Sequence, residues 1–132
     1  MEGTGRCLCG QIRYRFGAVA WCAHCHCDSC RRATSSPMTS FFGVPRDKFT
    51  LLSGKPALFQ SSPGVDRWFC PDCGSPIAYD AEADQANIHL YVASADRPAD
   101  FTPQKHVFVG KKLPWLTLDD HLPQFAGSST PE

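Results

Sequence analysis

Several features are missing from this sequence of 132 residues. No apolar run approaches the roughly 18 residues that cross a bilayer, and the opening MEGTGRCLCG lacks the apolar segment of a secretory signal peptide. Neither a run of Lys and Arg nor a basic stripe interleaved with aromatic residues is present, which argues against a nucleic-acid partner. We therefore expect a soluble cytoplasmic protein that binds neither membranes nor nucleic acids.

Internal repeats, heptads and low-complexity tracts are also absent. A chain of this length has room for one domain of ordinary size. We expect that domain to span residues 5–125, followed by a flexible tail at residues 126–132. The sequence leaves the oligomeric state open.

Helix-forming stretches are scarce, whereas strand patterns are common. Residues 11–16 and 87–92 alternate apolar and polar side chains with the period of two that indicates a half-buried strand. Turn sequences separate further β-favouring runs at 38–44, 49–52, 57–60, 66–69, 76–79 and 105–109. The sequence predicts a mainly β fold, arranged as an antiparallel meander, with one short helix after Cys27 that Asp28 caps.

Charge is unevenly placed, although the net charge is zero. Residues 1–70 hold nine Lys and Arg against four acidic residues, and residues 71–132 hold four against nine. Arginines cluster near cysteines in the first half, where they can offset thiolate charge or receive a carboxylate ligand. For any one of them, a solvated surface charge is the alternative.

The eight cysteines point to metal binding, because a reducing compartment disfavours structural disulfides. Cys70 and Cys73 have the spacing of a zinc knuckle, and Gly74 tolerates the left-handed backbone that follows. Cys7 and Cys9 supply a second close pair beside a predicted strand. If residues 11–16 paired with residues 66–69, four thiolates would meet and close a tetrahedral structural zinc site; disulfides or buried free thiols are the alternatives.

A second cysteine group lies at residues 22–30, where four thiols and two imidazoles occur within nine residues. Cys25, Cys27 and Cys30 can occupy three corners of a tetrahedron and leave the fourth to water or a substrate sulfur. Alternatively, Cys22, His24 or His26 closes the fourth corner. The spacing does not choose between an open catalytic zinc and a second structural one. Arg31 and Arg32 are placed to bind an anionic substrate near this centre.

Three segments together resemble the glutathione-dependent formaldehyde-activating enzyme family, which includes centromere protein V. They are GRCLCG at residues 5–10, HCHCDSCR at 24–31 and FCPDCG at 69–74. Later segments, ADRP at 95–98, PQKH at 103–106 and PW at 114–115, are similar to the closing signature of that family. The order and spacing of the cysteine groups make the resemblance specific.

The resemblance implies coiled antiparallel β-sheets around a structural zinc, a fold shared with methionine-R-sulfoxide reductases. It implies two Zn²⁺ ions, with Cys7, Cys9, Cys70 and Cys73 holding the structural one. The catalytic ion would be held by Cys25, Cys27 and Cys30, and Cys22 lies outside the pattern of the family. The implied activity is that of a carbon–sulfur lyase, condensing formaldehyde with glutathione to S-(hydroxymethyl)glutathione.

Two further functions compete with this one. In the first, both zinc ions are structural and the protein is a non-catalytic module that binds glutathione or a protein partner. In the second, the protein reduces methionine sulfoxide, which is disfavoured because no cysteine follows Cys73 to act as the nucleophile. An open fourth coordination position at the second zinc would favour the enzyme, and a position closed by a protein ligand would favour the binding module.

Overall fold

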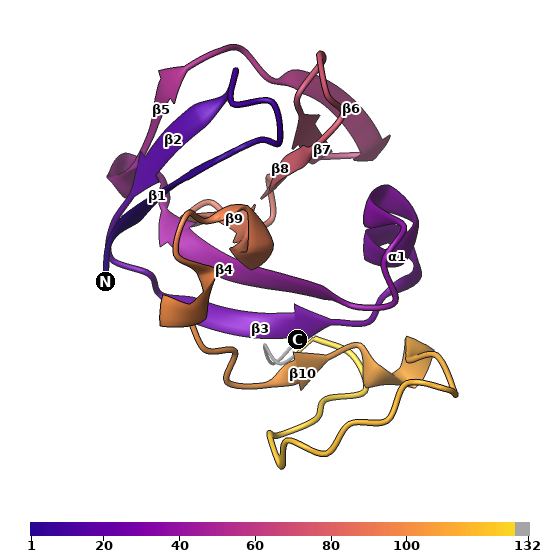
Figure 1. The fold of residues 1–132 in the computed structure, drawn as a ribbon. Helices are drawn as coiled ribbons and strands as arrows, with labels where there is room; N and C mark the ends of the chain where they lie inside the picture. The colour runs from indigo at the N-terminus through magenta and orange to yellow at the C-terminus, as the bar shows by residue number, and fades with distance from the viewer. Residues whose placement is uncertain (129–132) are drawn as a thin grey trace.

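The computed structural model describes residues 1–128, which form two β-sheets (Figure 1). The smaller sheet has three antiparallel strands in the order β1-β2-β5. Its strands are β1 (Gly3–Arg6), β2 (Arg13–Phe16) and β5 (Phe49–Ser53). It lies to one side of the larger sheet and carries the N-terminal cysteine pair between its first two strands.

The larger sheet has seven strands in the order β10-β3-β4-β9-β8-β7-β6. All neighbours are antiparallel except β10 and β3, which run parallel. The bounds are β3 (Trp21–Cys25), β4 (Thr39–Pro45), β6 (Ala57–Ser62), β7 (Val65–Phe69), β8 (Pro76–Ala81), β9 (Asn87–Tyr91) and β10 (His106–Val107).

Helical structure within residues 1–128 is limited to short segments. The α-helix α1 (Asp28–Thr34) connects β3 to β4 and ends at Ser35, which adopts a left-handed conformation. Four 3-10 turns complete the fold: η1 (Arg46–Lys48), η2 (Val92–Ser94), η3 (Pro98–Asp100) and η4 (Val109–Lys111). None of these helices has the length and apolar character that a bilayer-spanning segment requires.

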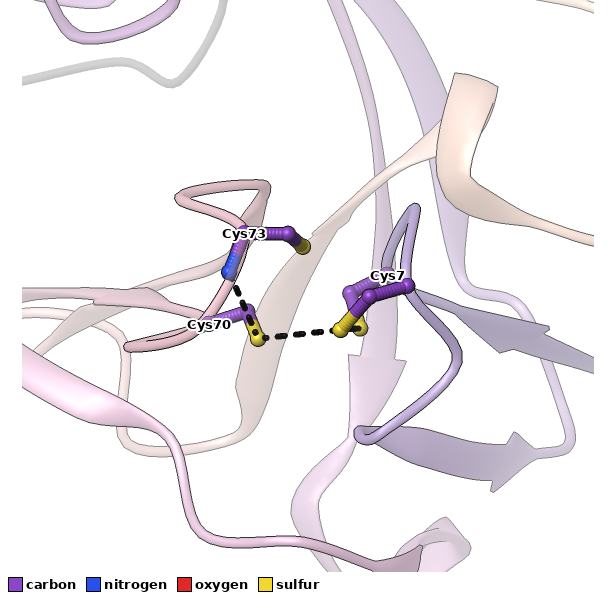
Figure 2. Close-up of side chains that lie close together, drawn as sticks. Cys7, Cys70 and Cys73 are labelled. Atoms are coloured by element: carbon purple, nitrogen blue, oxygen red, sulfur yellow. Dashed lines mark hydrogen bonds between the residues drawn. The ribbon is translucent and has the colours of Figure 1, made fainter.

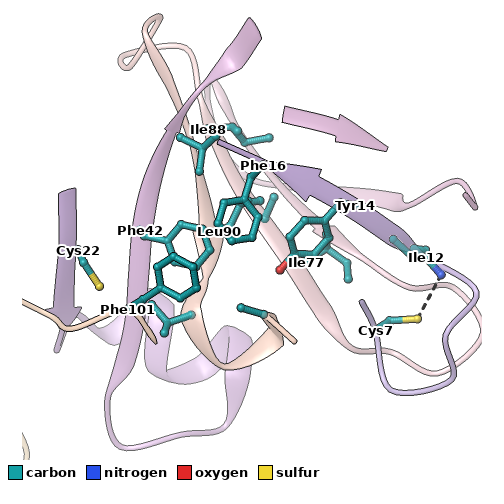
Figure 3. Close-up of a cluster of buried hydrophobic side chains, with 14 of the residues drawn as sticks. Cys7, Ile12, Tyr14, Phe16, Cys22, Phe42, Ile77, Ile88, Leu90 and Phe101 are labelled. Atoms are coloured by element: carbon teal, nitrogen blue, oxygen red, sulfur yellow. Dashed lines mark hydrogen bonds between the residues drawn. The ribbon is translucent and has the colours of Figure 1, made fainter. Parts of the chain in front are cut away.

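The core lies between the two sheets (Figure 3). Strand β2 turns Tyr14 and Phe16 inward, both at most 2% exposed, while Arg13 and Arg15 face solvent. The Phe16 ring packs against Phe42 of the larger sheet at 4.7 Å between ring centroids. This packing holds the two sheets together, and with them the loops that carry the cysteines.

The predicted mainly β fold is confirmed, as is the short helix that follows Cys27. The predicted meander is correct for β6 to β9 and wrong elsewhere. Strand β5 belongs to the smaller sheet, because it pairs with β2 in antiparallel orientation. Strand β10 pairs with β3 in parallel orientation. The sequence also gave no indication of β1 or β3. The expected likeness to methionine-R-sulfoxide reductases stays a prediction.

The predicted pairing of residues 11–16 with residues 66–69 is wrong. Strand β2 pairs with β1 and β5, and β7 pairs with β6 and β8. The two strands belong to different sheets because their apolar faces are buried by packing across the core. The cysteine pairs at their ends meet through this packing, without a hydrogen-bonded ladder between them.

The domain limits at residues 5 and 125 stay a prediction. Residues 126–128 of the expected tail are described, and there the carbonyls of Ala126 and Gly127 accept hydrogen bonds from the amides of Gly110 and Phe108. The rest of the expected tail, residues 129–132, lies outside the described residues.

Candidate metal centres

The first cysteine group joins the two sheets (Figure 2). Cys7 and Cys9 lie in the loop between β1 and β2, and Cys70 and Cys73 lie in the loop between β7 and β8. All four sulfur atoms are within 4.8 Å of one another. The structure therefore brings together the four residues that the sequence predicts for the structural site.

Tight turns aim these sulfurs at a common point. In the second loop the amide of Gly74 donates to the carbonyl of Cys70 at 2.8 Å, and Gly74 has a φ of 78°, as its left-handed position predicts. The amide of Ile12 donates to the Cys7 sulfur at 3.3 Å, and the amide of Cys73 donates to the Cys70 sulfur at 3.5 Å. Such amide donors stabilise thiolates, which are the metal-binding form of cysteine.

The donor set fits a tetrahedral zinc ion. With Zn–S bonds of about 2.3 Å, the sulfurs of such a site lie about 3.8 Å apart. The Cys9 sulfur lies 3.6 Å from that of Cys7 and 3.7 Å from that of Cys70. A hydrogen bond with Ser75 lowers the pKa of the Cys73 thiol to about 5. Four thiolates would complete the coordination and leave no position for a substrate, as expected for a metal that only stabilises the fold.

The second cysteine group is local in sequence. Cys25 is the last residue of β3, Cys27 is the residue directly before α1, and Cys30 lies in the first turn of α1. The structure corrects the predicted cap: the residue before the helix is Cys27, whose sulfur accepts a hydrogen bond from the amide of Cys30 at 3.4 Å, and Asp28 is already helical. A sulfur at this position can accept the amide hydrogen bond that a serine or aspartate oxygen usually accepts.

These three sulfurs also have the spacing of zinc ligands. All lie within 4.8 Å of one another, and the Cys25 and Cys30 sulfurs are 3.8 Å apart. Cys25 and Cys30 are buried, whereas Cys27 is half-buried and marks the side of the group that faces solvent. Hydrogen bonds from Cys25 and Cys30 lower the pKa of the Cys27 thiol. The group can therefore hold a metal ion through three sulfurs.

Cys22 does not join this group. Side chains alternate along a strand, so Cys22 and Cys25 of β3 point to opposite faces. The Cys22 side chain lies in the core beside Phe42 and Phe101 (Figure 3), and burial raises the pKa of its thiol to about 11. The structure thus removes Cys22 as a candidate fourth ligand.

His24 and His26, which lie between Cys22 and Cys27 in sequence, also have hydrogen-bond partners outside the second cysteine group. The Nδ1 atom of His24 is 2.7 Å from the Ser40 hydroxyl, and the Nε2 atom of His26 is 2.9 Å from Nδ1 of His106. His26 is fully buried. Within residues 1–128, no fourth cysteine, histidine or carboxylate lies with Cys25, Cys27 and Cys30. The fourth position of a tetrahedral ion would face solvent or a ligand.

Arg67 contacts the second cysteine group from β7. Its guanidinium nitrogens lie 3.9 and 4.0 Å from the Cys30 sulfur, it stacks over the Tyr79 ring at 5.1 Å and it hydrogen-bonds Tyr91. Burial opposes the charge of this guanidinium, but the Cys30 thiolate outweighs burial and raises the pKa of Arg67. Arg67 is one of the first-half arginines that the sequence places near a cysteine, where it could offset thiolate charge or receive a carboxylate. Its contact with Cys30 was not predicted, because 37 residues separate the two.

The predicted anion-binding residues Arg31 and Arg32 lie beside the second group but do not touch its sulfurs. They line a cavity of about 580 Å³ together with Ser35, Leu113 and Trp115. Arg31 forms an ion pair with Asp28, while its buried Nε atom has no hydrogen-bond partner among the described residues. Arg32 is exposed. The cavity can therefore receive a carboxylate.

A second cavity, of about 600 Å³, borders the first cysteine group at Cys7 and reaches Thr39 and Tyr91. Its charged groups already have protein partners. Arg6 donates to the carbonyls of Cys7 and Leu8, and Asp96 accepts from the Thr4 hydroxyl at 2.7 Å. We therefore regard the cavity at Arg31 and Arg32 as the better candidate for an anionic ligand.

Comparisons with known proteins identify a shared fold and a family. A crystal structure of a Rhodobacter sphaeroides protein has a TM-score of 0.61 and 20% identity, over 76% of this chain and 97% of that chain, which shows a shared fold. No curated protein matches the chain. The family model described as glutathione-dependent formaldehyde-activating enzyme matches residues 2–111, which include all eight cysteines. The resemblance carried by the three cysteine segments is thereby confirmed, and the chain belongs to the glutathione-dependent formaldehyde-activating enzyme family.

Proposed function

We propose that this protein is a zinc-dependent carbon–sulfur lyase that joins formaldehyde and glutathione as S-(hydroxymethyl)glutathione. In this reaction the glutathione sulfur bonds to the carbonyl carbon, the C=O π bond breaks, and the thiol proton ends on the new hydroxyl. Membership of the formaldehyde-activating family supports the choice of substrates. The residues that would perform the reaction are those of the second cysteine group.

One observation carries the proposal: the second group has three sulfurs and no fourth protein ligand within residues 1–128. Zinc in proteins takes four ligands, and catalytic sites keep one position for water or substrate. When bound, zinc supplies a Lewis acid that lowers the pKa of an incoming thiol. The half-buried Cys27 leaves that position open to solvent, whereas Cys25 and Cys30 are covered.

Arg67 supports the same role through charge. Three thiolates and a divalent ion carry a net charge of −1, which would repel a second anion such as the glutathione thiolate. Arg67 is 9% exposed, and its guanidinium lies next to the Cys30 sulfur, where it offsets this charge from the buried side. It acts as a positioning residue, because Ser61, Tyr79 and Tyr91 hold it against the sulfur.

Helix α1 links the cysteines to the cavity at Arg31 and Arg32. Cys27 directly precedes the helix, and Arg32 lies within it, five residues after Cys27 and about 8 Å from it along the helix axis. An extended tripeptide is about 10 Å long, and the thiol of glutathione belongs to its middle residue, so each end lies about 5 Å along the chain from that residue. The long Arg32 side chain covers the remaining distance, so a glutathione whose sulfur lies near Cys27 can place a carboxylate at Arg32.

X-ray absorption at the zinc edge tests the open position. With four sulfurs at one ion and three at the other, the protein loaded with zinc at the two cysteine groups alone should average about 3.5 sulfurs per zinc. Added glutathione should raise the mean to about 4, and Cys27→Ser should lower it. A mean of 4 without glutathione, or one that falls in Cys22→Ala, would overturn the open site.

Turnover then separates a catalyst from a binding module. Exchange NMR with labelled formaldehyde and glutathione measures the rate of adduct formation above the spontaneous rate. We expect acceleration by the zinc-loaded wild type and by Cys22→Ala, and none by Cys27→Ser. Glutathione binding with no acceleration would overturn the enzyme and favour the non-catalytic module.

A further inference from the structure

A third group of metal-ligating side chains lies apart from both cysteine groups, where β10 joins β3 (Figure 1). It consists of His24 on β3, His106 on β10 and Asp120 in the C-terminal segment. One ring nitrogen from each histidine and one carboxylate oxygen lie within 4.8 Å of one another. The proposed function uses none of these residues.

The parallel pairing of β3 and β10 explains why the two imidazoles are neighbours. His106 is directly opposite His24 in the register, so both side chains project from the same face of the sheet. Their rings stack with centroids 4.7 Å apart and an interplanar angle of 28°. Cys25 follows His24 and points to the other face, so the histidines and the thiolates are on opposite sides of β3.

The atoms not facing the common point already have hydrogen-bond partners. Nδ1 of His24 is 2.7 Å from the Ser40 hydroxyl, and Nδ1 of His106 is 2.9 Å from Nε2 of His26. Oδ1 of Asp120 accepts from the amide of Leu122 at 3.1 Å. Metal-binding histidines are usually fixed in this way through the other ring nitrogen. Each of the three side chains is therefore oriented and keeps one ligand atom.

His106 and Asp120 already meet at the atoms that would bind the ion. Nε2 of His106, whose side chain is 1% exposed, donates to Oδ2 of Asp120 at 2.7 Å. In a tetrahedral site with nitrogen and oxygen ligands, these atoms lie about 3.3 Å apart. Asp120 is 40% exposed, so its carboxylate can move outward by the difference while an ion replaces the shared proton.

We propose that His24, His106 and Asp120 form a third metal site, for a divalent first-row transition ion such as zinc. Two imidazoles and one carboxylate suit zinc, nickel, copper and iron(II), in contrast to the thiolate sets of the other groups. The bound ion carries a net charge of +1 with these ligands and takes water at its remaining positions. It ties the segment that carries Asp120 to the strand that carries Cys25.

Zinc titration of the untagged protein tests this site. The chain is first loaded at both cysteine groups, dialysed against metal-free buffer and then titrated with Zn²⁺ alone by calorimetry. We expect a third equivalent to bind at micromolar free zinc, and to bind at least tenfold more weakly in Asp120→Asn. The asparagine keeps the size of the side chain and an oxygen that can accept from His106, so the fold should be unaffected.

Asp119→Asn is the matched control, since Asp119 is 88% exposed and adjacent in sequence. It should bind the third equivalent as the wild type does, and His24→Gln should bind it as weakly as Asp120→Asn. Zinc-edge spectra of the third equivalent should show only nitrogen and oxygen ligands. A wild type that takes two equivalents, equal affinity in Asp120→Asn, or sulfur ligands at the third ion would each overturn the proposal.

Discussion

The two cysteine groups share a ligand chemistry and differ in where their ligands come from. The first joins Cys9 to Cys70, which are 61 residues apart, across two sheets. The second joins Cys25 to Cys30, which are five residues apart, at the start of one helix. The first has four cysteine sulfurs, and the second has three.

A metal cross-link stabilises the fold by different amounts at the two groups, because they close loops of different length. Closing a loop restricts the unfolded chain by an amount that grows with the logarithm of loop length. For loops of 61 and five residues the difference is about 2 kcal/mol in favour of the first group. We therefore expect a metal at the first group to stabilise the whole fold, and one at the second to order a single turn and to remain available for chemistry.

The largest expected effect is on folding at the first group. Cys70 is fully buried, so Cys70→Ser removes a ligand from a closed site and leaves a hydroxyl in its place. We expect the free energy of unfolding, measured with urea in the presence of zinc, to fall by about 4 kcal/mol or more.

Cys27→Ser is the comparison variant, because it removes one ligand from the other group. It should lose less than about 2 kcal/mol, since Cys27 is half-buried and its hydroxyl replacement can still cap α1. Its adduct-forming activity should disappear. If both variants lose the same unfolding free energy, the distinction between a structural and a catalytic group is wrong.

Arg67 gives the next largest effect, this time on activity. Arg67→Gln keeps a hydrogen-bond donor but removes the charge beside the Cys30 sulfur. We expect kcat/KM for adduct formation to fall about 30-fold, which corresponds to about 2 kcal/mol of lost stabilisation. A chelator should also extract the ion of the second group faster, which a merely structural role at β7 would not produce.

Arg13→Gln provides the control for Arg67, because Arg13 is exposed on β2 and also lies near a cysteine in sequence. It should leave both kcat/KM and the extraction rate unchanged. Equal values for the two variants would show that the buried guanidinium does not tune the thiolates.

A smaller effect is expected at the cavity beside α1. Arg32→Ala should raise KM for glutathione about fivefold and leave kcat unchanged, because an exposed charge-assisted contact contributes about 1 kcal/mol to binding. Lys48→Ala, also exposed but on η1, should leave KM as it is. A drop in kcat instead would place Arg32 at the reacting atoms.

Much of this comparison could be predicted from sequence, because ligand spacing and strand alternation are local. Cys70, Cys73 and Gly74 specify their turn within five residues. The alternation in residues 11–16 correctly places Tyr14 and Phe16 inside and Arg15 outside. These signals require no knowledge of what lies across the core.

What could not be predicted depends on tertiary contacts. Strand β1 has the sequence GTGR, with two glycines that disfavour strands, and β2 holds it in place. Burial does not alternate along β3, because Cys22 and Ala23 are buried on its two opposite faces. The contact of Arg67 with Cys30, and the meeting of His106 with Asp120 and His24, have no local pattern.

Cys22 is where the comparison of the two groups is most sharply tested, and there the expected effect is smallest. Its sulfur packs in the core with Phe42 and Phe101, on the opposite face of β3 from Cys25. Cys22→Ala should therefore destabilise the fold by only about 1 kcal/mol, the effect of a small cavity. Zinc content, sulfur count and turnover should match the wild type. Loss of one sulfur per chain would mean that Cys22 closes the second group, and both groups would then be structural.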